Sequence, residues 1–136
     1  MQIRHIIYIL ILGLLFGCTK NQTLSGNYCF CKYGSYVEIY FKGDSMRVAS
    51  NDEWIKLSKW KKIEIKNDTL YFETFGEWRY STKAKIKYLE NSKVELCFLD
   101  NDKNLNLNPI TQNLKIENSS EFWNGFNNRF NVKNCK

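Results

Sequence analysis

Residues 77–89, EWRYSTKAKIKYL, decide the fold class because two kinds of side chain alternate along them. One set is apolar or small and the other is polar: Trp78, Tyr80, Thr82, Ala84, Ile86 and Tyr88 against Arg79, Ser81, Lys83, Lys85 and Lys87. Successive side chains of a β-strand point to opposite faces of the sheet. The stretch therefore predicts one long, half-buried strand.

The same period-two pattern recurs on both sides of this stretch. It predicts further strands at residues 26–32, 35–41, 45–50, 54–57, 60–66, 69–75, 93–99 and, more briefly, 114–116. Turn-forming pairs such as Gly43-Asp44 and Asn67-Asp68 separate neighbouring strands. Residues 100–108 are rich in asparagine and predict a loop.

The hydrophobic period changes near the C-terminus. Three phenylalanines stand four residues apart, at Phe122, Phe126 and Phe130. This spacing predicts a short amphipathic helix over about residues 119–130, with Asn118 or Ser119 as its N-cap. We expect its aromatic face to pack on the sheet.

Short strands in up-and-down order, followed by one helix, predict a mainly β fold. The expected architecture is a small antiparallel up-and-down β-barrel with a short C-terminal helix, built by residues 26–136 as a single domain. Closure into a barrel is favoured because it removes exposed sheet edges.

Residues 24–28, LSGNY, resemble the first-strand signature of lipocalin-like barrels, in which a glycine precedes an aromatic residue by two positions. Gly26 and Tyr28 fit this spacing, although the family usually has tryptophan where Tyr28 stands. The resemblance implies a ligand cavity inside the barrel, lined by Phe72, Trp78 and Tyr80. The alternative is that these three aromatic side chains are plain core.

The N-terminus has the features of a secretory signal peptide at residues 1–17. Arg4 precedes an apolar run at residues 6–16, and these 11 residues are well short of the ~20 that span a bilayer as a helix. The run ends in Leu15-Phe16-Gly17-Cys18, which resembles the lipobox of bacterial lipoproteins, with Phe16 as a departure. An ordinary signal peptide and an N-terminal anchor helix are the alternatives.

The lipobox resemblance implies cleavage after Gly17, a diacylglyceryl group on Cys18 and acylation, as by palmitate, of the new amino group. Residues 18–25 then form a lipidated tether. Two or more acyl chains hold a protein stably at a membrane, so the membrane is an expected partner. Thr19 in place of aspartate predicts sorting to the outer membrane, and no acidic cluster follows Cys18, so we expect the periplasmic side.

Four cysteines remain after Cys18 and predict two disulfides in an exported domain. Cys29 and Cys31 leave the same, outward face of a strand about 6.6 Å apart, with parallel side chains that do not favour a direct bond. If the first strand closes against the last, Cys97 lies beside them. We predict that one of Cys29 and Cys31 bonds Cys97 and the other bonds Cys135. The CxC spacing is not the usual one for zinc, so no metal site is expected.

Composition excludes several functions. The only histidine, His5, is lost with the signal peptide, which removes histidine-based catalysis and metal ligation from the mature chain, and no cofactor is expected. A pair of acids among Asp68, Glu73 and Glu77 would allow carboxylate chemistry, but surface groups are the expected role, so we do not expect an enzyme.

The net charge of the mature chain is +5, since the formal +6 includes Arg4. The lysines are scattered, which favours a solvated face over a patch for anionic lipid or polymer, and nucleic acid is not an expected partner. The sequence thus predicts a membrane-anchored, non-catalytic binding or structural module, with a small apolar molecule as its ligand. The alternative is a protein-binding inhibitor or immunity lipoprotein of the cell envelope.

Overall fold

The structure, a computed structural model, describes residues 23–52, 56–114 and 117–135. The predicted signal peptide and lipidation at Cys18 therefore lie outside the described residues. The same holds for part of the predicted strands at 54–57 and 114–116, of which Leu57 forms an isolated bridge with Ala49.

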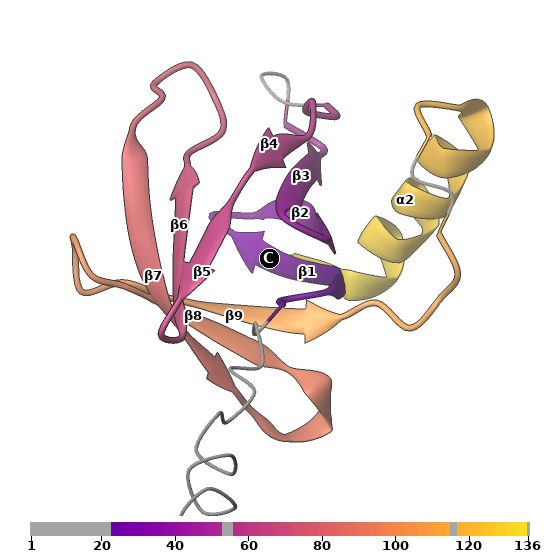
Figure 1. The fold of residues 1–136 in the computed structure, drawn as a ribbon. Helices are drawn as coiled ribbons and strands as arrows, with labels where there is room; N and C mark the ends of the chain where they lie inside the picture. The colour runs from indigo at the N-terminus through magenta and orange to yellow at the C-terminus, as the bar shows by residue number, and fades with distance from the viewer. Residues whose placement is uncertain (1–22, 53–55, 115–116, 136) are drawn as a thin grey trace, which may run out of the picture.

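The described residues form a nine-stranded sheet and one C-terminal α-helix, which confirms the predicted barrel (Figure 1). The strands are β1 Gly26–Lys32, β2 Ser35–Lys42, β3 Ser45–Ser50, β4 Lys61–Lys62, β5 Glu64–Lys66, β6 Thr69–Glu73, β7 Ser81–Tyr88, β8 Val94–Phe98 and β9 Asn104–Pro109. A 3-10 turn, η1 Glu90–Ser92, joins β7 to β8. The order β4-β3-β2-β1-β9-β8-β7-β6-β5 is antiparallel and up-and-down.

The barrel is nearly closed at a seam between β4 and β5. These two strands lie at opposite ends of the sheet order, yet only Ile63 separates them in the sequence. The backbone N–H of Ile63 donates to the carbonyl oxygen of Asp44 at 2.8 Å, in the turn between β2 and β3. The predicted strand at 60–66 is therefore one bent segment that passes from one half of the barrel to the other.

Two predictions about strand boundaries are wrong. The asparagine-rich segment predicted as a loop contains β9, which pairs with β8 on one side and with β1 on the other. Leu107 of β9 is fully buried and Leu105 packs against the core. In addition, β7 begins at Ser81 rather than at residue 77, so the first part of the alternating stretch lies outside the strand.

The core inside the barrel is built from the inward residues of the alternating strands. Thr82, Ala84 and Ile86 of β7 are buried while the lysines between them are exposed, as the sequence predicts. The inward cluster draws on all parts of the sheet and includes Tyr28, Phe30, Ile39, Phe41, Met46, Val48, Ile63, Leu70, Val94, Leu96 and Leu107.

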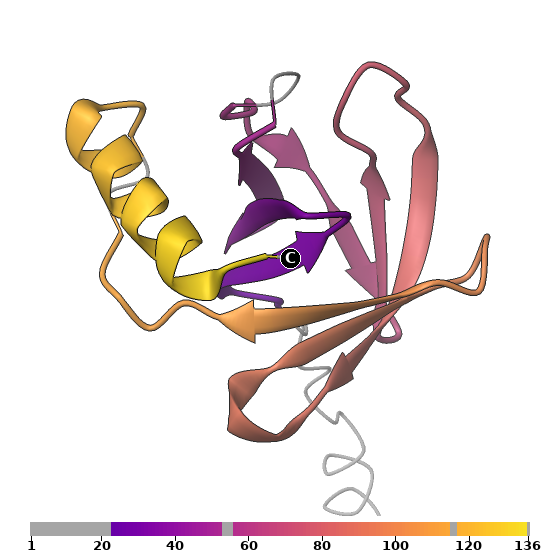
Figure 2. The same cartoon turned by 180° about the vertical axis from the view of Figure 1, so that it is seen from behind.

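The helix α2, Ser120–Lys133, covers the outer face of β1, β2 and β3 (Figures 1 and 2). Ser119 is its N-cap, and the hydroxyl oxygen of Ser119 accepts from the N–H of Phe122 at 3.2 Å. Phe122 and Phe126 are buried against Tyr36 and Tyr40, which confirms the predicted aromatic face. In the described part of the chain, no helix has the length and apolar character needed to cross a membrane.

Candidate functional site

The three predicted ligand-binding residues are separated in the structure. Phe72 of β6 is half-buried and packs edge-on against Phe98, with ring centroids 6.2 Å apart. Trp78 and Tyr80 lie in the loop between β6 and β7 and are 82% and 58% exposed. The predicted inward position of Trp78 and Tyr80 is wrong because the chain leaves the barrel wall after Glu73 and returns only at Ser81.

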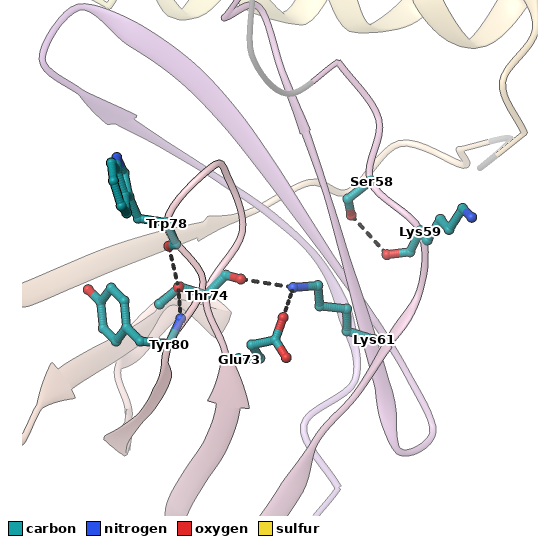
Figure 3. Close-up of polar contacts among 7 residues, drawn as sticks. All are labelled: Ser58, Lys59, Lys61, Glu73, Thr74, Trp78 and Tyr80. Atoms are coloured by element: carbon teal, nitrogen blue, oxygen red, sulfur yellow. Dashed lines mark hydrogen bonds and ion pairs between the residues drawn. The ribbon is translucent and has the colours of Figure 1, made fainter.

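Thr74 organises the loop that presents these two aromatic side chains (Figure 3). Its backbone N–H donates to the carbonyl oxygen of Tyr80 at 2.9 Å, and its hydroxyl donates to the carbonyl oxygen of Trp78 at 3.2 Å. The same hydroxyl oxygen accepts from the N–H of Tyr80 at 3.1 Å. Gly76 has a φ of +117°, which a side chain other than glycine rarely adopts. The loop is therefore held by its own hydrogen bonds.

Lys61 of β4 joins this loop to the seam (Figure 3). Its Nζ donates to Oε1 of Glu73 at 2.6 Å and to the carbonyl oxygen of Thr74 at 2.9 Å. It also lies 4.7 Å from the ring centroid of Phe75, within cation–π range. Its hydrogen bond and positive charge lower the pKa of the Glu73 carboxyl.

An open groove of about 910 Å³ follows the seam, and we call it the seam groove. Its apolar lining comes from Ile63, Ile65 and Phe72. Its polar lining includes Thr23, Asp44, Lys62, Glu73 and Thr82. The groove thus extends from the start of the described chain, at Thr23, to the end of β6, at Glu73. The half-buried side chain of Phe72 lines this groove.

The structure does not bring Asp68 and Glu73 together. Asp68 directly precedes β6 and Glu73 is its last residue, and five residues of a strand span about 16 Å. The paired carboxylates of glycosidases are at most about 10 Å apart. Glu77 is exposed in the loop, and Glu73 is already bound by Lys61. These acids are arranged as surface groups.

Sequence reasoning missed a buried polar network beneath α2. Glu38 of β2 is fully buried, and its carboxylate accepts from the hydroxyls of Tyr36 and Tyr40 and from the guanidinium of Arg129. Burial, followed by the interaction with Glu38, raises the pKa of both tyrosines well above 10. The available signal was the pair of tyrosines on either side of Glu38, on the outward face of β2. That face is covered by the helix, so the arrangement serves to hold α2 in place.

One of the two predicted disulfides is formed. Cys31 is bonded to Cys135, with Cα atoms 5.4 Å apart, which ties the end of α2 to β1. Cys29 and Cys97 are free thiols, so a Cys29–Cys97 bond is absent and that part of the prediction is wrong.

The reason is the position of β9 between β1 and β8. Cys29 lies opposite Asn108 of β9, and Cys97 lies opposite Asn104 of the same strand, so a whole strand separates the two thiols. Among the described residues, no group of three or more Asp, Glu, Cys or His side chains is arranged to hold a metal ion.

Comparison with known proteins adds no relative to these observations. No protein-family model matches the chain, and no curated protein or solved structure matches it at a significant level. The described residues thus form a nearly closed nine-stranded barrel, a C-terminal helix that a disulfide ties to β1, a groove along the seam and an exposed aromatic loop between β6 and β7.

Proposed function

We propose that this chain is a lipid-anchored, non-catalytic binding module of the bacterial cell envelope, held at the periplasmic side of the outer membrane. In this proposal the lipid on Cys18 tethers the barrel to the membrane. The seam groove binds a small ligand with an apolar body and a polar end.

The observation that carries the proposal is the position of Thr23 on the wall of the groove. Thr23 follows Cys18 by five residues, and five residues of fully extended chain span at most about 18 Å. A groove that begins at the end of so short a tether stays close to the membrane surface. An amphiphile that leaves the bilayer would meet the groove first.

The lining supports this kind of ligand. Ligand pockets of about 300–1,000 Å³ are usual, and the seam groove falls within that range. Ile63, Ile65 and Phe72 offer an apolar surface, while Lys62 and Glu73, the latter paired with Lys61, offer charged groups. The inward side chains of the barrel form one buried hydrophobic cluster, and the groove lies at its edge, since Ile63 belongs to the cluster and Ile65 and Phe72 pack against it.

Two observations support a role without catalysis. The mature sequence contains no histidine, the commonest general acid and base. Asp68 and Glu73, at opposite ends of β6, are also too far apart to act as a carboxylate pair.

A photoactivatable fatty acid tests the proposal with the mature lipidated protein in phospholipid vesicles. Ser81 is exposed and lines the groove, so Ser81→Trp should block it. Lys83→Trp is the matched control because Lys83 is exposed on the same face of β7, two residues away. We expect labelled peptides from residues 61–73, reduced about tenfold by Ser81→Trp, which corresponds to about 1.4 kcal/mol, and unchanged by Lys83→Trp. Equal labelling of the two variants would refute ligand binding in the groove.

A further inference from the structure

The loop between β6 and β7 displays two large aromatic side chains that the core does not use. Trp78 is 82% exposed and Tyr80 is 58% exposed. Figure 3 shows both side chains projecting to the same side of the loop, away from Lys61. Within the described residues, neither ring is stacked on another aromatic ring. The two rings therefore offer free faces to a ligand.

We propose that Trp78 and Tyr80 form a stacking platform for sugar rings of the peptidoglycan glycan strand. This function is separate from ligand binding in the seam groove, and its choice of glycan rests on the proposed envelope location. The C–H groups on one face of a pyranose ring carry partial positive charge. They are attracted to the negative face of an indole or phenol ring.

The platform is arranged before any ligand binds. Thr74 holds the loop through hydrogen bonds to the backbone of Trp78 and Tyr80, and Lys61 holds the carbonyl oxygen of Thr74. A loop already in its binding conformation loses little conformational entropy on association. The free energy of weak stacking interactions can then contribute to affinity, because it need not offset the entropy cost of ordering the loop.

The size of the patch favours a sugar over a protein. A stable protein interface uses about 20–30 residues a side. The loop from Thr74 to Tyr80 supplies two exposed rings, Trp78 and Tyr80. The two exposed rings, on alternate residues, offer an area that suits one or two sugar rings and is much smaller than a protein interface.

Charge and position favour this glycan in particular. Glu77 and Arg79 flank Trp78, so the loop offers both an acceptor and donors to hydroxyl and acetamide groups. Figures 1 and 2 both place the loop at the opposite end of the barrel from the start of the described chain. A loop so placed points away from the anchoring membrane and toward the cell wall.

The test uses the full-length mature protein in detergent micelles, with two probes. One is purified peptidoglycan, assayed by co-sedimentation, and the other is a soluble N-acetylglucosamine tetramer, assayed by isothermal titration calorimetry. Trp78→Ala is expected to weaken binding of both probes about tenfold, and Trp78→Phe to restore part of it. Tyr33→Ala is the matched control, because Tyr33 is 89% exposed in the turn between β1 and β2. We expect it to bind as the unchanged protein does.

Because Trp78 is exposed, its replacement should leave the unfolding transition unchanged, so loss of binding is separable from loss of fold. The proposal is overturned if Trp78→Ala retains peptidoglycan binding, or if the unchanged protein binds neither probe. It is also overturned if Trp78→Ala abolishes binding to an envelope protein while glycan binding stays intact. Each of these results leaves ligand binding in the seam groove untouched.

Discussion

Arg129 of α2 and Glu38 of β2 form a two-point ion pair across 91 residues of sequence. Nε of Arg129 donates to Oε1 of Glu38 at 2.7 Å, and Nη2 donates to Oε2 at 3.0 Å. The Glu38 side chain is fully buried, and that of Arg129 is 12% exposed. The pair therefore holds α2 against β2 at one defined position along the helix.

Loss of this pair should destabilise the protein strongly. Arg129→Met leaves the Glu38 carboxylate buried without its cation, which typically costs about 3–5 kcal/mol. Arg79→Met, at an exposed arginine in the β6–β7 loop, is the control and should change the free energy of unfolding by less than about 0.5 kcal/mol. Urea denaturation followed by circular dichroism measures both. Equal effects of the two substitutions would contradict a buried, paired Glu38.

The tyrosines of this network predict a loss of stability at high pH. Burial raises the pKa of Tyr36 and Tyr40 above the ordinary 10.0, so in the folded protein both stay protonated where the unfolded chain ionises. Their contribution is therefore complete below pH 10 and falls above it, by up to about 1.4 kcal/mol per pH unit for each tyrosine. The part of the tyrosinate absorbance that comes from Tyr36 and Tyr40 should accordingly rise only with unfolding.

Tyr40→Phe isolates one of the two contributions. This variant removes one ionisable group, so its unfolding free energy should fall less steeply above pH 10 than that of the unchanged protein. Denaturation at several alkaline pH values gives the two slopes. Identical slopes would show that Tyr40 ionises freely in the folded state.

The two free thiols should differ in reactivity. Burial raises the pKa of the Cys29 thiol and also shields it, whereas Cys97 is half-exposed. Since the thiolate is the reactive form, a maleimide should modify Cys97 in the native protein and Cys29 only in denaturant. Peptide mass spectrometry after labelling locates the adducts. Native labelling at Cys29, or a Cys29–Cys97 crosslink, would contradict the strand order around β9.

The Cys31–Cys135 disulfide should stabilise the packing of α2 on the barrel. It spans 104 residues of sequence, and loss of a native bond in a small exported domain typically costs about 2–5 kcal/mol. Cys135→Ser should therefore lower the free energy of unfolding by about this amount, while Cys97→Ser, at a free thiol, should have little effect. Comparable stability of the two variants would show that the helix is held without the disulfide.

Alternation predicted most of the strands because one face of each is buried. Val37, Ile39 and Phe41 of β2 point inward as expected, and Cys29 of β1 points outward. The pattern failed at Trp78 and Tyr80 because a loop held by hydrogen bonds can continue an alternating sequence without belonging to the wall. Alternation reports which side chains differ in polarity, not where pairing ends.

At β9 the error was the reverse: the sequence predicted a loop where the structure has a strand. Asparagine is depleted in strands, so its three asparagines outweighed the alternation of Leu105 and Leu107. Pairing on both sides overcame that propensity. This error also caused the wrong prediction of a disulfide at Cys97, because a barrel without β9 would place Cys97 directly beside β1. Long-range partners such as Glu38 and Arg129 also depend on where the helix docks, which local sequence does not determine.

Whether Cys18 carries lipid is decided most directly by the mass of the N-terminal peptide of the protein purified from membranes. We predict a peptide that begins at Cys18 and carries a diacylglyceryl group with an acylated amino group, and a Cys18→Ala variant that accumulates as the full-length precursor. A peptide that begins at Met1, or an unmodified Cys18, would contradict the lipid anchor and with it the membrane-facing groove.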